Sequence, residues 1–451
     1  MGGEWREVRV GELVTQGVLE ISDGYRVRND ELGPQGIPFV RGGDIRDGWI
    51  NTATEDHIRP EFAERVVSKL SQPRDVAFIT KGTVGRAGRL RIGQPQVVFA
   101  PQVAYWRVKA PDVIDSEFLF YLIRSSAFQD ALYGVMTHGS MVADYVSISQ
   151  QHDFVFRIPD IVSQRAIARV LGAIDDKIEV NRQVHETLEP ALQAFFESWF
   201  VNFEPVRGRA EHRGSKLPKA VAELFPARLV DSERGQVPEG WGIVRLGDLI
   251  ETVKGRSYNS DELVDSETAL VTLKSFKRGG GYRSDGLKSF AGTYKENQVV
   301  KPGELVIACT DVTQAAEVIG RPAIVRASPS FRTLVASLDT LIVRPKSDGV
   351  GHAFLYCLAR TEAFIAHTYA QTIGTTVLHL ARDAVPSFLF ACPPRKVVEV
   401  FDLLARSLLA RIQASDREGD SLAELRDALL PKLLSGELRV PNAERLLERT
   451  L

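Results

Sequence analysis

Residues 163–200 read SQRAIARVLGAIDDKIEVNRQVHETLEPALQAFFESWF, and this stretch decides the fold. Its apolar residues recur at alternating steps of four and three, the a/d spacing of a heptad repeat, which predicts one long amphipathic helix. Ser163 is the expected N-cap, and Pro190 is expected to bend or loosen the helix without ending it. The helix would be roughly 55 Å long, and its apolar stripe needs a partner. The stripe consists of Ile167, Leu171, Ile174, Ile178, Leu188, Leu192, Phe195 and Trp199, with the polar residues Asn181 and His185 between them.

The expected partner is residues 397–434, where a second apolar stripe follows much the same spacing. At an offset of 234 positions, Ser415 and Gly419 fall on the polar positions of the first stripe. We therefore expect an antiparallel coiled coil whose polar residues fix its register. The second stripe is less regular, because Gly419 and Asp420 disfavour a helix and Arg426 occupies an apolar position. The alternative is two unrelated amphipathic helices, each packed on its own domain.

The whole chain is duplicated, because three separated segments recur 236 positions later. Trp5 recurs as Trp241, residues 117–122 (EFLFYL) as 353–358 (AFLYCL), and the Ala-Phe pair at 127 as the pair at 363. This pattern predicts an α+β protein in which two pseudo-repeated mixed α/β domains are separated by two long helices. The expected segments are a first domain (1–160), a first helix (161–201), a linker (202–239), a second domain (240–394), a second helix (395–438) and a C-terminal tail (439–451).

Short apolar runs bounded by proline and glycine predict the strands of each domain. The expected strands are 76–79, 97–100 and 103–106 in the first domain, and 304–307, 323–325 and 341–343 in the second. Short helices are expected around residues 118–132 in the first domain and 354–370 in the second. The linker is rich in proline, glycine and charge, so we expect one short helix there, with residues 224–226 (LFP) as a docking point.

Composition limits the classes to which the protein can belong. A chain of 451 residues with a net charge of −2 is expected to form two or three domains, and any basic surface must be local. No membrane span and no secretion signal are present, which predicts a cytoplasmic protein. Cys309, Cys357 and Cys392 lie too far apart in sequence for a recognisable metal motif or disulfide framework.

Motifs of catalysis are absent from the sequence. There is no Walker loop, HExxH, GxSxG or strand–GxGxxG–helix fingerprint, and residues 392–395 (CPPR) lack the flanks of the amino-methyltransferase tetrapeptide. The eight histidines form no ligand cluster. We expect a binding protein with no catalytic residue, metal or cofactor of its own.

The candidate binding surfaces are polar, glycine-rich and basic loops, because Arg and Lys can contact guanine or phosphate and Gln can contact adenine. Any one of these loops could also be an ordinary solvated turn or a helix cap. The first-domain candidates are Arg41, Lys81, Thr83, Arg86, Thr137, His138, Gly139 and Ser140. The second-domain candidates are Lys274, Lys277, Arg278, Thr310, Thr313, Gln314, Thr372, Gly374, Thr375 and Thr376. Two such domains on an antiparallel helix pair would suit a split DNA site whose parts lie about one helical turn, roughly 34–36 Å, apart.

Three further segments carry a family resemblance. Residues 171–208 (LGAIDDKIEVNRQVHETLEPALQAFFESWFVNFEPVRG), 223–241 (ELFPARLVDSERGQVPEGW) and 421–440 (SLAELRDALLPKLLSGELRV) resemble the specificity subunit of type I restriction–modification systems. The likeness covers essentially the full chain. It implies two target recognition domains that read the halves of a bipartite DNA sequence, and helices that space them.

The resemblance also implies the partners. Two methyltransferase (modification) subunits would dock on the helical region, and two restriction subunits would join that core. S-adenosylmethionine, ATP and Mg would be bound by those partners and not by this chain. We expect the aromatic residues Phe195, Phe196 and Trp199 to serve partner docking, and Asp175 and Arg182 to lie on the solvated face of the helix. The alternative functions are a tandem-domain scaffold that does not bind DNA and an enzyme with an unfamiliar active site.

Overall fold

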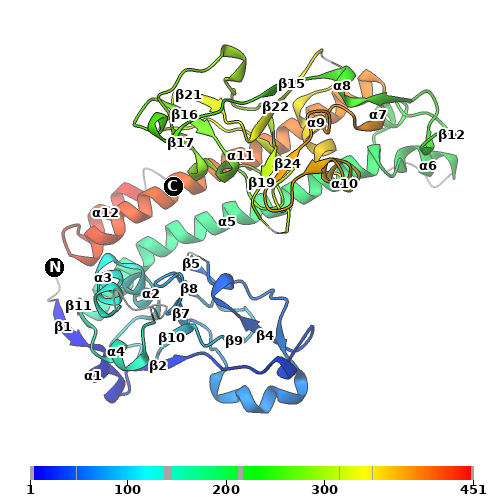
Figure 1. Ribbon diagram of the computed structural model, residues 1–451. Helices are drawn as coiled ribbons and strands as arrows, with labels where there is room; N and C mark the ends of the chain where they lie inside the picture. Colours follow the sequence, from blue (N-terminus) through cyan, green and yellow to red (C-terminus); the bar gives the residue numbers. More distant parts are fainter. Residues whose placement is uncertain are drawn as a thin grey trace. The chain divides into compact units, whose positions relative to one another are not determined.

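The computed structural model describes residues 5–46, 48–136, 145–211, 217–313, 315–347 and 349–447. The chain forms two compact units, the first comprising residues 1–181 and 418–451 and the second residues 182–417 (Figure 1). This division differs from the expected series of separate segments, because each long helix contributes part of its length to both units. We call residues 5–160 the first head and residues 240–394 the second head.

Both long helices are continuous. Helix α5 (Ile161–Phe200) and helix α11 (Arg395–Leu434) are each 40 residues long. Pro190 lies inside α5, which continues beyond it as expected. Helix α11 runs through Gly419 and Asp420, so these residues do not break it.

The start of α5 differs from the prediction, because Asp160 and not Ser163 caps it. The Asp160 carboxylate accepts the backbone N–H of Ser163 at 3.0 Å and the Ser163 hydroxyl at 2.9 Å. These bonds lower the pKa of Asp160 below its usual range. The carboxylate also favours the positive end of the helix dipole.

In the first unit the two helices run antiparallel. Asp175 of α5 accepts a hydrogen bond from Arg426 of α11 at 3.0 Å, and Lys177 pairs with Glu418 at 3.3 Å. Later residues of α5 therefore contact earlier residues of α11, as in an antiparallel pair. Asp175 is buried, which corrects the expectation that it is solvated. The irregular seam residue Arg426 is thereby matched by a buried carboxylate. The apolar residues of this seam that join the core of the first head include Leu171, Ile174, Leu422 and Leu429.

In the second unit the pairing is again antiparallel. Phe401 of α11 stacks on Phe195 of α5 with ring centroids 5.7 Å apart, and Asp416 bonds His185 at 2.9 Å. The apolar residues of both helices join the core of the second head. Each helix segment therefore packs on the other helix and on a head, so the alternative of unrelated helices is wrong.

The first head is built on a sheet whose central strands are buried on both faces. Phe78 and Trp106 meet Phe128 of the helical layer edge-on, with ring centroids 5.1 and 5.4 Å apart. The opposite face packs on the second sheet through Tyr105 and Phe99. The five-stranded sheet has the order β2 (Leu19–Asp23), β10 (Val103–Val108), β7 (Val76–Ile79), β8 (Ala87–Arg89), β5 (Gly48–Trp49), and the second sheet has the order β3 (Leu32–Gly33), β6 (His57–Ile58), β4 (Ile37–Val40), β9 (Val98–Phe99).

The second head repeats this plan. Its four-stranded sheet has the order β15 (Ile250–Lys254), β22 (Thr340–Pro345), β18 (Leu305–Ala308), β20 (Pro322–Ile324). One three-stranded sheet has the order β17 (Lys288–Ser289), β16 (Thr268–Val271), β21 (Thr333–Ala336). Another three-stranded sheet has the order β19 (Thr310–Asp311), β24 (Leu378–Leu380), β23 (Thr372–Ile373). The predicted strands are present with shifts of up to a few residues at their ends.

Each predicted helical region contains two short helices. The first head has α2 (Ser116–Arg124) and α3 (Ser126–Val135), and the second has α9 (His352–Ala359) and α10 (Glu362–Tyr369). Ser125 and Thr361 separate them, because each residue is extended and its hydroxyl accepts a backbone N–H of the following helix. The remaining short helices of the heads are α1 (Val10–Thr15), α4 (Ile148–His152) and α8 (Leu246–Leu249).

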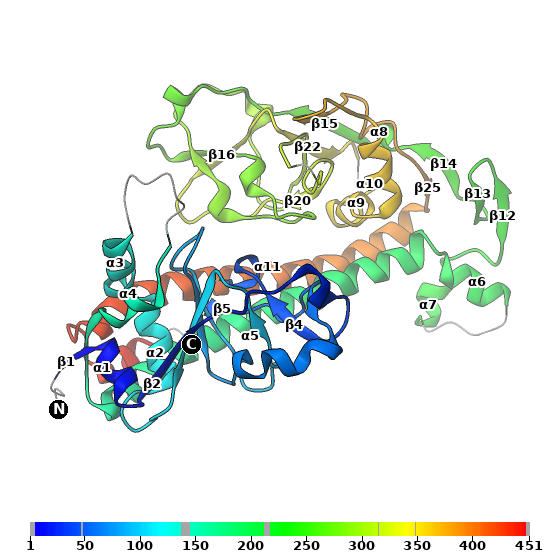
Figure 2. The ribbon, with the colours of Figure 1, turned by 60° about the horizontal axis from the view of Figure 1, so that its bottom comes forward.

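A two-stranded pairing closes each head, and the linker is more structured than expected. The closing pairs are β1 (Arg6–Arg9) with β11 (Val155–Ile158) and β14 (Gly242–Arg245) with β25 (Leu389–Cys392). The described linker contains two helices and a hairpin, namely α6 (Glu204–Ala210), α7 (Lys219–Ala222), β12 (Leu229–Ser232) and β13 (Gly235–Pro238), where one helix was predicted (Figure 2). Phe225 of the docking segment is buried against Trp199. The tail contains α12 (Val440–Leu447).

Candidate nucleic-acid interface

Both heads place the same two segments side by side. In the first head, the loop after β7 meets the segment after the two helices through a bridge between Lys81 and Tyr145. In the second head, β19 follows β18 and pairs with β24, with Thr310 opposite His379. The strands β7 and β18 are equivalent in the repeat, so the duplication presents one equivalent surface on each head.

The second head extends this surface into a hairpin. Strands β23 and β24 pair with Ile373 opposite His379, and the loop between them carries the predicted residues Gly374, Thr375 and Thr376. Gly374 has a φ of +113°, and a Cβ there would lie 2.1 Å from the carbonyl oxygen of Val377. Only glycine fits this turn without strain. Both threonines are exposed, whereas the predicted residue Thr372 donates its hydroxyl to the carbonyl of Tyr369 at 2.9 Å.

A buried carboxylate orders the loop beside the hairpin. Asp311 accepts the backbone N–H groups of Thr313, Val318 and Ile319 at 2.7, 2.6 and 3.0 Å. Burial by itself raises the pKa of Asp311, but these hydrogen bonds outweigh burial and lower it. Thr313 also accepts the N–H of Glu317 at 3.2 Å, so its hydroxyl serves the loop.

Thr310 is another predicted contact whose side chain serves the fold. It is buried, and its hydroxyl lies 3.4 Å from Nδ1 of His379. Gln314, predicted in the same loop, lies outside the described residues, as do Thr137, His138, Gly139 and Ser140 of the first head.

The predicted cations of the first head differ in availability. Arg41 pairs with Asp56 at 2.8 Å, and Arg86 donates to the carbonyl oxygen of Ile45 at 3.3 Å. Lys81 is exposed and has no side-chain partner among the residues that the structure describes. Thr83 is exposed in the same turn. Lys81 is therefore the predicted cation of the first head that is most available to a phosphate.

The glycine-rich basic loop of the second head is partly engaged within its unit. Arg278 pairs with Glu317 at 3.3 Å, and the charge of Lys277 affects the pKa values of His185 and Asp416. The positive charge of Lys277 therefore interacts electrostatically with residues of both long helices. Lys274 is exposed and unpaired among the described residues, and it is the best available cation of the three.

A charged network joins the second head to both helices. His185 of α5 bonds Asp416 of α11 through Nδ1 at 2.9 Å, and its Nε2 lies 3.4 Å from Glu189. These two carboxylates raise the pKa of His185 to about 9, against the effect of burial. Asp416 also pairs with Arg326 at 3.2 Å. The sequence predicted polar residues at the centre of the seam, but His185 is matched by carboxylates of both helices.

Glu189 connects the same network to helix α9. It accepts the Tyr356 hydroxyl at 2.6 Å and pairs with Arg360 at 3.0 Å. Burial opposes ionisation of Glu189, but His185, Arg360 and Tyr356 together lower its pKa to about 2. The protonated histidine and the ionised glutamate stabilise each other at neutral pH.

The aromatic cluster assigned to partner docking is instead part of the core. Phe196 is 0% and Trp199 2% exposed, and both pack on Phe401. Phe195 is partly buried on the same ring. Because a buried side chain offers no surface to another subunit, the docking assignment for Phe196 and Trp199 is wrong, and these residues join α5 to the second head.

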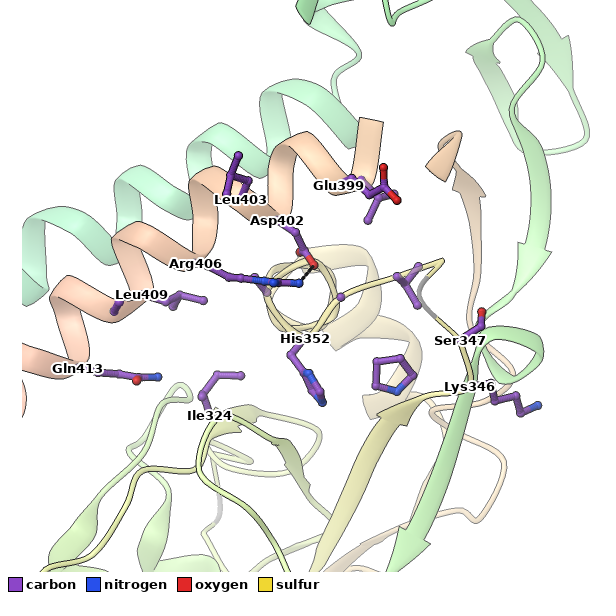
Figure 3. A pocket seen from close by; sticks show the side chains of 17 residues that line it. Ile324, Lys346, Ser347, His352, Glu399, Asp402, Leu403, Arg406, Leu409 and Gln413 are labelled. Atoms are coloured by element: carbon purple, nitrogen blue, oxygen red, sulfur yellow. Dashed lines mark hydrogen bonds and ion pairs between the residues drawn. The ribbon is translucent and has the colours of Figure 1, made fainter. Parts of the chain in front are cut away.

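A groove of about 960 Å³ lies between α11 and the second head (Figure 3). His352, Asp402 and Arg406 line it, and the exposed Leu403 lies at its side. Asp402 accepts the N–H of Phe354 at 2.9 Å and lies 3.4 Å from Arg406. Asp402 therefore stabilises the start of α9. The lining of the groove contains both acidic and basic side chains, so it has no excess of positive charge that would favour DNA.

Several residues at the shared surface were missed by the sequence analysis. Lys254, His379 and Arg382 lie around the base of the second hairpin. Tyr133 and Tyr369, which are 236 positions apart, are both exposed just before the equivalent segments. The repeat offset could have identified the tyrosine pair, whereas the lysine and arginine come from strands and loops that only the fold brings together.

The described residues contain no group of His, Cys, Asp and Glu that could hold a metal ion, and no helix among them is long and apolar enough to span a bilayer. Burial raises the pKa of all three cysteine thiols, that of Cys309 to about 12, so they are not activated nucleophiles.

Comparison with known proteins identifies relatives over almost the entire length. The type I restriction enzyme MjaIX specificity subunit of Methanocaldococcus jannaschii is 25% identical over 97% of both chains. The HindI specificity subunit of Haemophilus influenzae is 21% identical over 72% of this chain and 78% of its own. The chain is a homologue of type I restriction enzyme specificity subunits.

The fold agrees with this homology. The crystal structure of the type I restriction–modification S subunit from M. genitalium matches 96% of each chain with a TM-score of 0.55 at 12% identity. The expected resemblance to specificity subunits and the two-domain α+β fold with long helices are thus confirmed. No protein-family model matches the chain.

Proposed function

We propose that this homologue is the DNA-recognition subunit of a type I restriction–modification complex and reads a bipartite, asymmetric target with its two heads. The observation that carries the proposal is the repeated surface. Both heads join the loop after the central strand to the segment after the helices, yet they present different side chains there. Two similar readers with different chemistry suit two different half-sites.

The available side chains suggest how each head contacts DNA. Lys81 and Lys274 are exposed cations suited to phosphates, which position a protein on the duplex without reading sequence. Thr375 and Thr376 are exposed hydroxyls that can donate to or accept from base edges. Arg41, Arg86 and Arg278 would have to leave an intramolecular partner to bind, so we assign them smaller contributions.

The helices would hold the two readers. Each unit contains segments of both α5 and α11, and buried polar contacts fix the register in each unit separately. In this proposal the helix pair sets the length of the unspecific spacer between the half-sites. Inserting about four residues, one helical turn, into both helices should lengthen the spacer. An unchanged spacer would refute this role of the helices.

The chemistry would belong to other subunits. The complex would contain two modification subunits that bind S-adenosylmethionine and methylate the DNA, and restriction subunits that use ATP and Mg. This chain would work with them on DNA in the cytoplasm.

The direct test is to exchange the first head for that of a relative and map the methylated adenines in cells that express the complex. One half of the motif should change while the other remains. If both halves change, or methylation continues unchanged without this chain, the two-reader proposal fails. A scaffold that does not bind DNA would leave the motif intact under every head exchange.

A further inference from the structure

The hairpin of the second head carries an aliphatic face. Thr310, His379 and Ile373 are cross-strand neighbours in the order β19–β24–β23, so their side chains lie on one face. Val312 directly follows β19 and Val377 directly precedes β24, so both adjoin the strands that carry this row. We call Val312, Ile373, Val377 and His379 the tip face.

The tip face is unusually exposed for its chemistry. Val312 is 68%, Ile373 67% and Val377 38% exposed, and none of them belongs to a hydrophobic core cluster of the described residues. These β-branched aliphatic side chains therefore lie outside the cores that stabilise the head. Such a patch is typical of a binding surface.

The surroundings of the tip face favour an anionic partner. A cavity of about 490 Å³ lies at the base of the hairpin, lined among others by Lys254, His379, Arg382 and Asp339. Lys254 and Arg382 are exposed, and neither has an ion-pair partner among the described residues. Asp339 is the only carboxylate in this lining. An apolar face flanked by free cations is complementary to a DNA groove, where apolar base substituents lie between two rows of phosphates.

We infer that the second head recognises thymine 5-methyl groups in the major groove through Ile373 and Val377, with Val312 beside them. The methyl group is the apolar feature of the major-groove edge of an A·T pair, and aliphatic side chains recognise it by contact. His379, Thr375 and Thr376 can bond the neighbouring oxygen and nitrogen atoms. Lys254 and Arg382 would hold adjacent phosphates. This inference rests on the proposed function and specifies how one of its two readers works.

The first head has different chemistry at the equivalent position. Lys81 stands where the second head has Thr310, and Tyr145 stands opposite it in place of His379. The methyl contact is therefore assigned to the half-site that the second head reads.

The test uses the full chain assembled with its modification subunits and a duplex that carries the mapped methylation motif. Each thymine of the motif is replaced in turn by deoxyuridine, which removes only the methyl group, and Kd is measured by fluorescence anisotropy. At one or more positions of the half-site read by the second head, Kd should rise roughly four-fold, the effect of one buried methyl group.

A double variant assigns the effect to the tip face. I373S/V377S should bind thymine and deoxyuridine duplexes equally, because the contact that distinguishes them is gone. The matched control is V264S, which changes an exposed valine elsewhere in the second head and should keep the four-fold difference. Thermal melting of each complex checks folding, which is expected to be unchanged because the replaced side chains are exposed.

Two results would overturn the inference. No deoxyuridine effect in the second half-site would remove the methyl contact, and an effect that persists in I373S/V377S would place the contact elsewhere. In both cases specific binding of the unmodified duplex would leave the proposed function standing. Loss of the proposed function would instead appear as equal binding of the motif and an unrelated duplex by the unaltered complex.

Discussion

The two heads share one architecture but are attached to the helix pair by different chemistry. In the first unit, Asp175 accepts Arg426 at 3.0 Å and the Tyr121 hydroxyl at 2.7 Å. In the second, Glu189 takes the corresponding place beside Tyr356 and Arg360. Helix α5 supplies the carboxylate in both units, so the duplicated chain is not symmetric at its attachment points. The polar contacts that join a head to the helices therefore differ between the two units.

Each head also contributes an arginine to its attachment. Arg124 and Arg360 are 236 positions apart, and each lies near the α5 carboxylate of its unit, at 3.7 and 3.0 Å. The second unit adds a histidine to the cluster. The following predictions test what each difference contributes.

The largest effect is expected from D175A. It removes the buried carboxylate that accepts from both Arg426 and Tyr121, so Arg426 retains the exposed Asp427 as a partner but loses the buried one. Breaking one side of a buried pair typically costs about 3–5 kcal/mol of stability. Chemical denaturation of the assembled complex should show this loss. E186A is the control, because the exposed pair of Glu186 with Arg182 contributes at most about 1 kcal/mol. Equal stability of D175A and E186A would show that the buried attachment of the first unit is unimportant.

The next largest effect is expected in the pH dependence of stability, through His185 of the second unit. Because the folded pKa of His185 is raised from 6.5 to about 9, its stabilisation is complete below pH 6.5 and is lost as the pH rises towards 9. The loss should be on the order of 2 kcal/mol. Thermal melting of the wild type at pH 6.5 and 9 should show a fall in Tm that is smaller in H185Q. The same fall in both proteins would assign the pH dependence to other groups.

A smaller and more local effect is expected at the hairpin. G374A places a Cβ at a φ of +113° against the carbonyl of Val377, a strain of about 1–3 kcal/mol. Binding should weaken for duplexes that contain the second half-site, with little change in the melting of the helix pair. G235A in the linker hairpin is the control, because Gly235 has a φ of +90° but no neighbouring atom lies within 4 Å of an added Cβ. If G374A left DNA binding unaltered, the hairpin would not be part of the interface.

The smallest effects should come from single phosphate contacts. K81A and K274A should each reduce the slope of log Kobs against log salt by about 0.9. The loss should be similar for all DNA sequences, because phosphates carry no sequence information. R41A is the matched control, since Arg41 is held by Asp56. Unchanged salt slopes for both lysine variants would exclude these side chains from the contact.

The sequence by itself determined the repeat and the two long helices. Apolar residues that recur every 3.5 residues over 38 positions predict a helix that pairs with another helix. Three segments that recur at the same offset of 236 positions indicate that the chain is duplicated. It also located the loops that contain Lys81 and Thr375, because glycine and threonine between buried strands mark exposed turns.

Only the tertiary structure decided which of these side chains is available. Heptad spacing places Phe196 and Trp199 near a seam, but their burial depends on Phe401, some 200 residues away. Arg426 interrupts the apolar heptad pattern of α11, but its charge is paired with Asp175 of the antiparallel helix α5. Burial and ion pairing are properties of neighbours in space, and a periodicity along one segment carries no information about the residues that another segment places against it.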